Sequence, residues 1–188
     1  MPDHCIIAVI GAAKAGKRTL ISAVSERFTE GLSVLQVTTT RSPEPREDDT
    51  LFFRTMKPWR FNVLSAAGKL IDTVEHLGER YAYESSAIED ALRRGHLIGP
   101  MRETTVVALR KKGHTVFTVR VVARYRVGTE MESGAGDAFA DVIKLRADMT
   151  VVNIRDHHGR EMAVDHLAYL VNMWTGLLPS GQSPLACL

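Results

Sequence analysis

The chain has 188 residues, a length that suits a single domain or one domain with a small additional lobe. Hydrophobic residues make up 45% of the chain and charged residues 24%, values that exclude a disordered or low-complexity protein. The formal net charge of +2 predicts neither a nucleic-acid partner nor a membrane partner.

The two cysteines, Cys5 and Cys187, stand near opposite ends of the chain. Two such distant thiols cannot form a disulfide framework, so we expect free thiols in a reducing compartment. No apolar segment approaches the roughly 20 residues that a membrane-spanning helix needs. Asp3 precedes the first apolar run, where a signal peptide would carry positive charge. These features predict a cytoplasmic protein.

Short apolar runs alternate with amphipathic segments along most of the chain. Strands are predicted at residues 5–10, 33–40, 51–54, 70–77, 96–98, 115–122 and 150–154. Helices are predicted at residues 17–28, 60–67, 85–94, 104–112 and 160–174. Parallel strands need crossover connections, which are usually helical. The alternation therefore predicts an α/β fold in which helices flank a parallel sheet.

We expect residues 1–188 to form one domain. The polar, proline-containing stretch at residues 43–60 interrupts the alternation, which indicates a small lobe inserted into the main sheet. Residues 128–136 are small and polar, and the segment after Leu177 carries two prolines and a glycine. Both segments are therefore predicted to be mobile.

A glycine-rich loop lies directly between the first predicted strand and the first predicted helix. Glycines at its two ends allow backbone N–H groups to surround phosphate oxygens, and the helix directs its positive end at the same anion. Lys17 can reach the β- and γ-phosphates of a nucleotide. The expected ATP-binding residues of this loop are Gly11, Ala12, Ala13, Lys14, Ala15, Gly16, Lys17, Arg18 and Thr19.

The end of this loop departs from the usual signature. A serine or threonine normally follows the lysine, whereas here Arg18 holds that place and Thr19 comes next. The Lys-x-Thr ending is typical of nucleoside monophosphate kinases, and Thr19 is the expected ligand of a Mg²⁺ cofactor. The alternative interpretation is a chance glycine-rich turn with a surface lysine.

Three further pieces resemble the guanylate kinase family in their order and spacing: Thr38-Thr39-Thr40-Arg41-Ser42-Pro43, then Glu47, then Gly78-Glu79-Arg80-Tyr81. The resemblance is good over residues 1–115 and looser beyond them. It implies a P-loop nucleotide-kinase fold with a core, an inserted monophosphate-binding lobe at residues 36–85, a short lid at residues 123–147 and a flexible tail at residues 178–188. It also implies transfer of a phosphoryl group from ATP, with Mg²⁺, to a nucleoside monophosphate, with GMP or dGMP as the expected acceptor.

The resemblance assigns roles by position. Arg41 and the Tyr81 hydroxyl would bind the acceptor's phosphate, and Asp72 and Glu103 would accept hydrogen bonds from guanine. The other residues implied for the acceptor site are Thr38, Arg46, Phe53 and Arg102. Asn153, in a strand similar to the family's last strand, would belong to the ATP site. The candidate catalytic residues are Lys17, Arg41 and, from the lid, Arg124, Arg126 and Arg146.

Two of these roles have simpler readings, and several positions depart from the family's pattern. Asp72 could be an ordinary strand-end charge, and Glu103 an acid that favours a helix N-terminus. Glu44 stands where the family has a second phosphate-binding arginine, for which Arg46 could compensate if the loop bends. Phe53 replaces a tyrosine that binds phosphate, and Met101 replaces an aspartate near the metal and the phosphates.

Two alternative functions therefore stay open. The ribose bisphosphate phosphokinase of phosphonate metabolism resembles this chain in its phosphate loop, and one of its arginines matches Arg102. Its acceptor would be ribose 1,5-bisphosphate, but it has no acid that matches Asp72. The other alternative is a catalytically inactive, guanylate-kinase-like module that binds proteins. The expected partners are small-molecule nucleotides, with no nucleic acid and no membrane, and a homodimer is left open.

Overall fold

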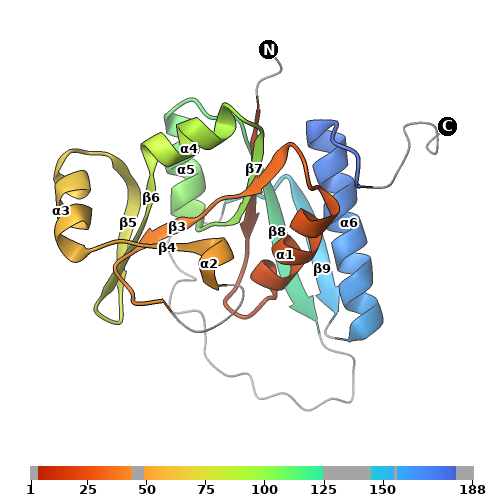
Figure 1. Ribbon diagram of the computed structural model, residues 1–188. Helices are drawn as coiled ribbons and strands as arrows, with labels where there is room; N and C mark the ends of the chain where they lie inside the picture. The colour runs from red at the N-terminus through yellow and green to blue at the C-terminus, as the bar shows by residue number, and fades with distance from the viewer. Residues whose placement is uncertain (1–3, 44–48, 125–144, 155, 181–188) are drawn as a thin grey trace.

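The computed structural model describes residues 4–43, 49–124, 145–154 and 156–180, and two β-sheets organise this part of the chain (Figure 1). The strands of the larger sheet are β1 (Ile6–Ile10), β2 (Leu32–Val34), β7 (His96–Pro100), β8 (Val116–Arg124) and β9 (Met149–Ile154). They lie in the order β2-β7-β1-β8-β9, and every neighbouring pair is parallel. Each residue of β1 is buried, as its continuous apolar run predicts for a central strand.

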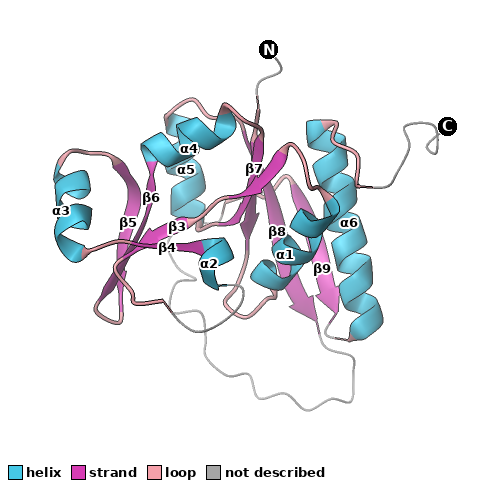
Figure 2. Ribbon diagram, viewed as in Figure 1, coloured by secondary structure: helices cyan, strands magenta, loops and turns pink. Residues whose placement is uncertain are grey.

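Helices cover both faces of the larger sheet (Figure 2). They are α1 (Lys17–Arg27) and α6 (His157–Thr175) on one face, and α4 (Ser85–Leu92) and α5 (Glu103–Lys111) on the other. Side chains alternate along β1, so Ile7 and Val9 pack with α1 and α6. Ile6 and Ile10 face the opposite core with α4 and α5. The predicted fold class, a parallel sheet flanked by helices, is confirmed.

A second, smaller sheet is formed within residues 36–85, the segment for which an inserted lobe is predicted. Its elements are β3 (Val37–Thr39), α2 (Asp49–Phe52), β4 (Phe53–Thr55), α3 (Pro58–Ala66), β5 (Leu70–His76) and β6 (Glu79–Glu84). The strand order is β4-β3-β6-β5, with β6 antiparallel to both of its neighbours. Met56, Phe61 and Ala82 form a small core of their own beside this sheet.

Two predicted strands in this region are wrong, and one observed strand is missing from the prediction. Residues 33–40 are not one strand, because the chain leaves the larger sheet after Leu35, whose N–H donates to the carbonyl of Ile98 at 2.8 Å, and enters the second sheet at Val37. Residues 51–54 are divided between the end of α2 and the start of β4. Strand β6 is missing from the prediction, because its first residues, Glu79 and Arg80, are charged and give no apolar run.

The carboxyl ends of the parallel strands meet at one edge of the larger sheet, the lower edge in Figure 1. The glycine-rich loop leaves β1 at this edge, and α5 begins there after β7. The second sheet lies beside α4 and α5. None of the described helices has the length and apolar character needed to cross a membrane.

Candidate active site

The loop after β1 has a backbone that only glycine adopts easily at its two ends. Gly11 has φ +135°, and a Cβ atom there would lie 2.4 Å from the carbonyl oxygen of Val121. Gly16 has φ +89°, and its Cβ would lie 2.4 Å from Nδ2 of Asn153. At both positions the backbone has a positive φ and neighbouring atoms come too close for a side chain, so both positions require glycine.

Lys17 and Asn153 hold the loop in its curved shape. The Lys17 ammonium donates to the carbonyl oxygens of Gly11 and Ala12 at 2.6 and 2.5 Å. The buried Asn153, at the carboxyl end of β9, donates from Nδ2 to the carbonyl of Ala15 at 2.9 Å. Asn153 thus attaches the loop to the sheet, and the Lys17 ammonium places a positive charge beside the loop. This arrangement suits a bound polyphosphate.

The middle of the loop is exposed to solvent. Ala12, Ala13 and Lys14 are exposed, and Lys14 itself has φ +60°. Thr19 is exposed on the first turn of α1. In the described part of the chain, no three histidine, cysteine or acidic side chains come together as metal ligands. A single hydroxyl suits Mg²⁺, which usually keeps several waters and takes its other ligands from substrate phosphates.

Phe53 of β4 is the point where the phosphate loop meets the second sheet. The guanidinium carbon of Arg41 lies 4.7 Å from the centre of the Phe53 ring, and that of Arg18 lies 5.5 Å from it. Tyr81 of β6 approaches the same ring edge-on, with the ring centres 6.4 Å apart. Three of the residues predicted for the acceptor site, Arg41, Phe53 and Tyr81, are therefore neighbours.

Asp72 lies on a β-bulge in β5, between the paired residues Ile71 and Val74. Its φ of +53° turns the side chain out of the regular alternation. Oδ2 of Asp72 accepts hydrogen bonds from the hydroxyls of Thr104, at 2.9 Å, and of Thr105. Oδ1 lies 3.7 Å from Nη2 of Arg102, so Arg102 and Asp72 are brought together at the start of α5.

Tyr83 ties this region to the larger sheet. Its hydroxyl donates to the carbonyl of Pro100 at 2.6 Å. Burial, and secondly the negative charge of Asp72, raise the pKa of Tyr83 well above its usual value. The hydroxyl therefore stays protonated and fixes β6 against the end of β7.

Glu103, the first residue of α5, is engaged by the protein itself. Its Oε1 accepts from Nη2 of Arg120 at 2.8 Å, and its Oε2 accepts from the backbone N–H of Leu145 at 2.8 Å. Arg120 also donates to the carbonyl of Leu145 at 2.7 Å. The side chains of Glu103 and Arg120 thus hold the segment that leads into β9, and both carboxylate oxygens of Glu103 have partners within the protein.

The other predicted residues are placed as follows. Thr38 is buried on β3, where it pairs with Ala82 and with Arg54. Arg124 ends β8, Arg146 follows Leu145, and both side chains are exposed. Arg46 and Arg126 lie outside the described residues, as do Glu44 and most of the predicted lid. Ser180, in the predicted tail, donates from its backbone to the carbonyl of Arg27 at 2.6 Å.

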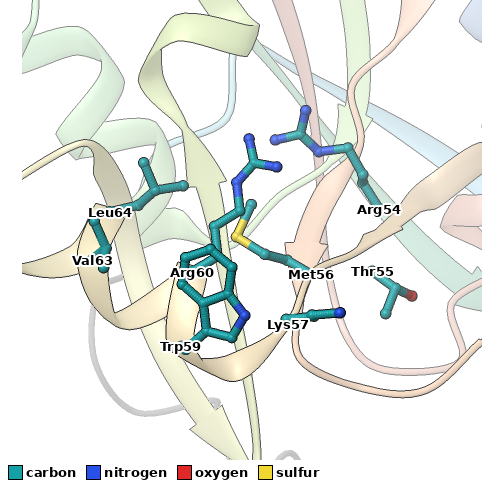
Figure 3. A pocket seen from close by; sticks show the side chains of 8 residues that line it. All are labelled: Arg54, Thr55, Met56, Lys57, Trp59, Arg60, Val63 and Leu64. Carbon is teal, nitrogen blue, oxygen red and sulfur yellow. The ribbon is translucent and has the colours of Figure 1, made fainter.

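A groove of about 640 Å³ lies on the outer side of the second sheet, between β4 and α3 (Figure 3). Arg54, Lys57 and Arg60 line it together with Trp59, whose side chain points outward and is 64% exposed. None of the residues predicted for the site lines this groove, so it is separate from the phosphate loop.

Sequence reasoning missed several residues of the site. Thr104, Thr105 and Tyr83 carry no motif, because their roles depend on Asp72 and Pro100, which are distant in sequence. Arg120 could have been found, since it is a lone charge in the middle of an apolar strand.

Comparison with known proteins gives a consistent result. No family model matches the sequence. The guanylate kinase of Alkalilimnicola ehrlichii is 33% identical over 81 residues, which are 43% of this chain and 39% of that protein. That of Bordetella pertussis is 31% identical over 96 residues, 50% of this chain and 44% of that protein. That of Vibrio parahaemolyticus is 34% identical over 82 residues, 43% of this chain and 40% of that protein. The matched part thus spans about two-fifths of the length of these curated relatives.

The structural similarity to a guanylate kinase covers more of this chain than the sequence similarity does. The crystal structure of guanylate kinase from Anaplasma phagocytophilum matches with a TM-score of 0.61 over 92% of this chain and 86% of that chain, at 15% identity. This chain is therefore similar to guanylate kinases in sequence over about half of its length and in fold over nearly all of it.

Proposed function

We propose that this protein transfers the γ-phosphoryl group of ATP to a nucleoside monophosphate, with GMP or dGMP as the acceptor. The observation that carries the proposal is the junction at Phe53, where Arg18 of the phosphate loop and Arg41 beside β3 meet on one ring. The junction puts a candidate donor site next to a candidate acceptor site. Direct phosphoryl transfer requires such proximity between donor and acceptor.

Positioning and positive charge are the main demands of phosphoryl transfer. In the proposed mechanism the Lys17 ammonium moves from the carbonyls of Gly11 and Ala12 to the β- and γ-phosphates of ATP. The loop N–H groups bind the remaining phosphate oxygens, and Asn153 keeps the loop curved. Thr19 would hold Mg²⁺, which neutralises phosphate charge when it is bound with the nucleotide.

The acceptor would lie over the second sheet. Arg41 would bind its phosphate through a planar guanidinium, with the Tyr81 hydroxyl as a further donor. Arg124 and Arg146, at the described ends of the predicted lid, remain candidates for additional positive charge. Thr38 would support this region from its buried place on β3.

Asp72 would select guanine. Its Oδ2 is already engaged by Thr104 and Thr105, so Oδ1 is the oxygen that would accept from the N1–H or the amino group of the base. Adenine presents no such pair of donors on that edge. Arg102, 3.7 Å from Oδ1, would lie beside the bound base.

The experiment is a coupled ADP-release assay with ATP, Mg²⁺ and a panel of acceptors: GMP, dGMP, AMP, dTMP and ribose 1,5-bisphosphate. The proposal predicts turnover with GMP or dGMP. Turnover with ribose 1,5-bisphosphate alone would move the protein to the sugar-phosphate kinases. Turnover with a pyrimidine nucleotide alone would show that Asp72 does not read guanine.

Asp72→Asn sharpens the test of base recognition. An amide can present its oxygen to the threonines or to the guanine edge, but not to both, so one donor loses its acceptor. A loss of about 1–3 kcal/mol, or 5- to 150-fold in GMP affinity, is expected, with ATP affinity unchanged. Asparagine adopts a positive φ as readily as aspartate, so the backbone is preserved. An equal loss for both nucleotides would contradict the assignment.

Calorimetry with ATP and Mg²⁺ separates the enzyme from an inactive binding module. The phosphate-loop geometry supports binding, because a module without a phosphate ligand has no physical need for the curved loop and its lysine. Absence of heat up to millimolar ATP would favour the module instead.

A further inference from the structure

Arg18 departs from the usual role of the residue after a phosphate-loop lysine. It is the second residue of α1, directly after Lys17, and successive helical residues point about 100° apart. The Lys17 ammonium accordingly contacts the loop carbonyls, whereas the Arg18 guanidinium lies 5.5 Å from the centre of the Phe53 ring. Arg18 therefore faces the second sheet rather than the loop.

A second guanidinium shares the same ring. The guanidinium carbon of Arg41 lies 4.7 Å from the centre of the Phe53 ring, and that of Arg18 lies 5.5 Å from it. Because both distances end at the same point, the two guanidinium carbons are at most about 10 Å apart. Each cation is attracted to the aromatic face. The two cations nevertheless repel each other at this separation, and an anion bound beside the ring would be attracted by both.

We propose that Arg18 binds the acceptor's phosphate together with Arg41, and that Phe53 is the platform that orients both guanidinium groups. This assignment rests on the proposed function, since it names a further residue of the same acceptor site. Two consecutive cations would then bind different substrates: Lys17 would bind the donor and Arg18 the acceptor. Acceptor binding would then tie the second sheet directly to the phosphate loop.

The chemistry of arginine fits this role. A guanidinium presents a planar fork of N–H donors to two oxygens of one phosphate, whereas a lysine provides only a point charge. Contact with the Phe53 ring would restrain each guanidinium before the phosphate binds, so less rotational freedom is lost on binding. The ring itself offers no hydrogen bond, so its contribution is to position the two arginines.

The decisive measurement compares GMP with guanosine, which lacks the phosphate. Calorimetry of the full-length protein should show a 10- to 100-fold weaker GMP affinity in Arg18→Ala, the loss expected for hydrogen bonds to a charged group. Guanosine and ATP affinities should stay within about twofold of the wild type. Arg18→Lys should restore part of the lost GMP affinity. Arg60→Ala, which removes an exposed arginine of the outer groove, is the control for net charge.

Phe53 needs a test that a purely structural role would not pass. Phe53→Leu should raise the KM for the monophosphate with little change in the KM for ATP, and Phe53→Tyr, which keeps the ring, should restore it. Thermal unfolding midpoints close to that of the wild type would show that the variants are folded.

The outcomes separate this assignment from the proposed function. If wild-type protein binds GMP and Arg18→Ala binds it equally well, or if the variant loses ATP affinity instead, Arg18 does not serve the acceptor. Equal losses for GMP and guanosine would likewise refute a phosphate contact. If the wild type binds neither GMP nor any other monophosphate of the panel, the proposed function fails and the assignment fails with it.

Discussion

Replacing Gly16 by alanine tests how the phosphate loop keeps its shape. The residue has φ +89°, and the new Cβ would lie 2.4 Å from Nδ2 of Asn153. That amide is buried and donates to the carbonyl of Ala15 at 2.9 Å. Because asparagine is short and packed, it can avoid the new methyl group only by giving up this hydrogen bond.

The structure sets the expected size of the effect. A left-handed backbone costs alanine about 1–2 kcal/mol. A buried carbonyl that loses its donor costs about 1–3 kcal/mol more. Gly16→Ala should therefore lower the free energy of unfolding by about 2–5 kcal/mol, and Asn153→Ala by about 1–3 kcal/mol. In the Asn153→Ala background the same Gly16→Ala change should cost only about 1–2 kcal/mol, since the hydrogen bond is already gone.

Urea unfolding of the four proteins completes this double-mutant cycle, with calorimetry of ATP binding as a second readout. Gly68→Ala is the matched control, because Gly68 has φ +65° and no atom within 4 Å of its Cβ position. That variant should show the backbone cost alone. Effects of Gly16→Ala and Asn153→Ala that add within about 0.5 kcal/mol would refute the reasoning, since independent sites behave in this way.

Two further predictions concern groups away from the phosphate loop. Burial, and secondly the nearby His4, lower the pKa of His96 from the ordinary 6.5, so the unfolded chain binds this proton more readily. The unfolding free energy should therefore fall as the pH drops through about 6.5, and His96→Gln should flatten that part of the urea-derived pH profile; an unchanged profile would contradict this. Glu103→Gln places an amide against two donors, Arg120 and the Leu145 N–H, and should lower the free energy of unfolding by about 1–2 kcal/mol in urea. A change below about 0.3 kcal/mol would show that this clamp does not stabilise the fold.

The phosphate loop and its flanking elements could be predicted because their signals are local. An uninterrupted apolar run marks β1 as a strand buried on both faces, and Gly11 and Gly16 mark the turns of the loop. Local patterns of apolar residues likewise predict seven further elements within a few residues of their observed bounds: α1, α4, β7, α5, β8, β9 and α6. The resemblance to the guanylate kinases added Arg41, Phe53 and Tyr81, which the fold brings together.

The rest could not be predicted because it depends on tertiary contacts. Nothing local shows that the chain changes sheets between Leu35 and Val37, since both halves have the same strand-like composition. The bulge that turns Asp72 toward Thr104 is a property of the β5–β6 pairing. Arg18 is expected from the sequence to bind ATP, and only the tertiary structure shows that its guanidinium lies 5.5 Å from the centre of the Phe53 ring.

Phosphoryl transfer itself is the central claim, and ³¹P NMR of a mixture of the protein, ATP, GMP and Mg²⁺ tests it most directly. The account predicts that ADP and GDP appear in equal amounts with wild-type protein. It also predicts that Lys17→Ala, a folded variant by thermal unfolding, forms them orders of magnitude more slowly, because the loop then lacks the cation that reaches the transferred phosphate. Formation of both products at an undiminished rate by Lys17→Ala, or no GDP from the wild type, would contradict the account.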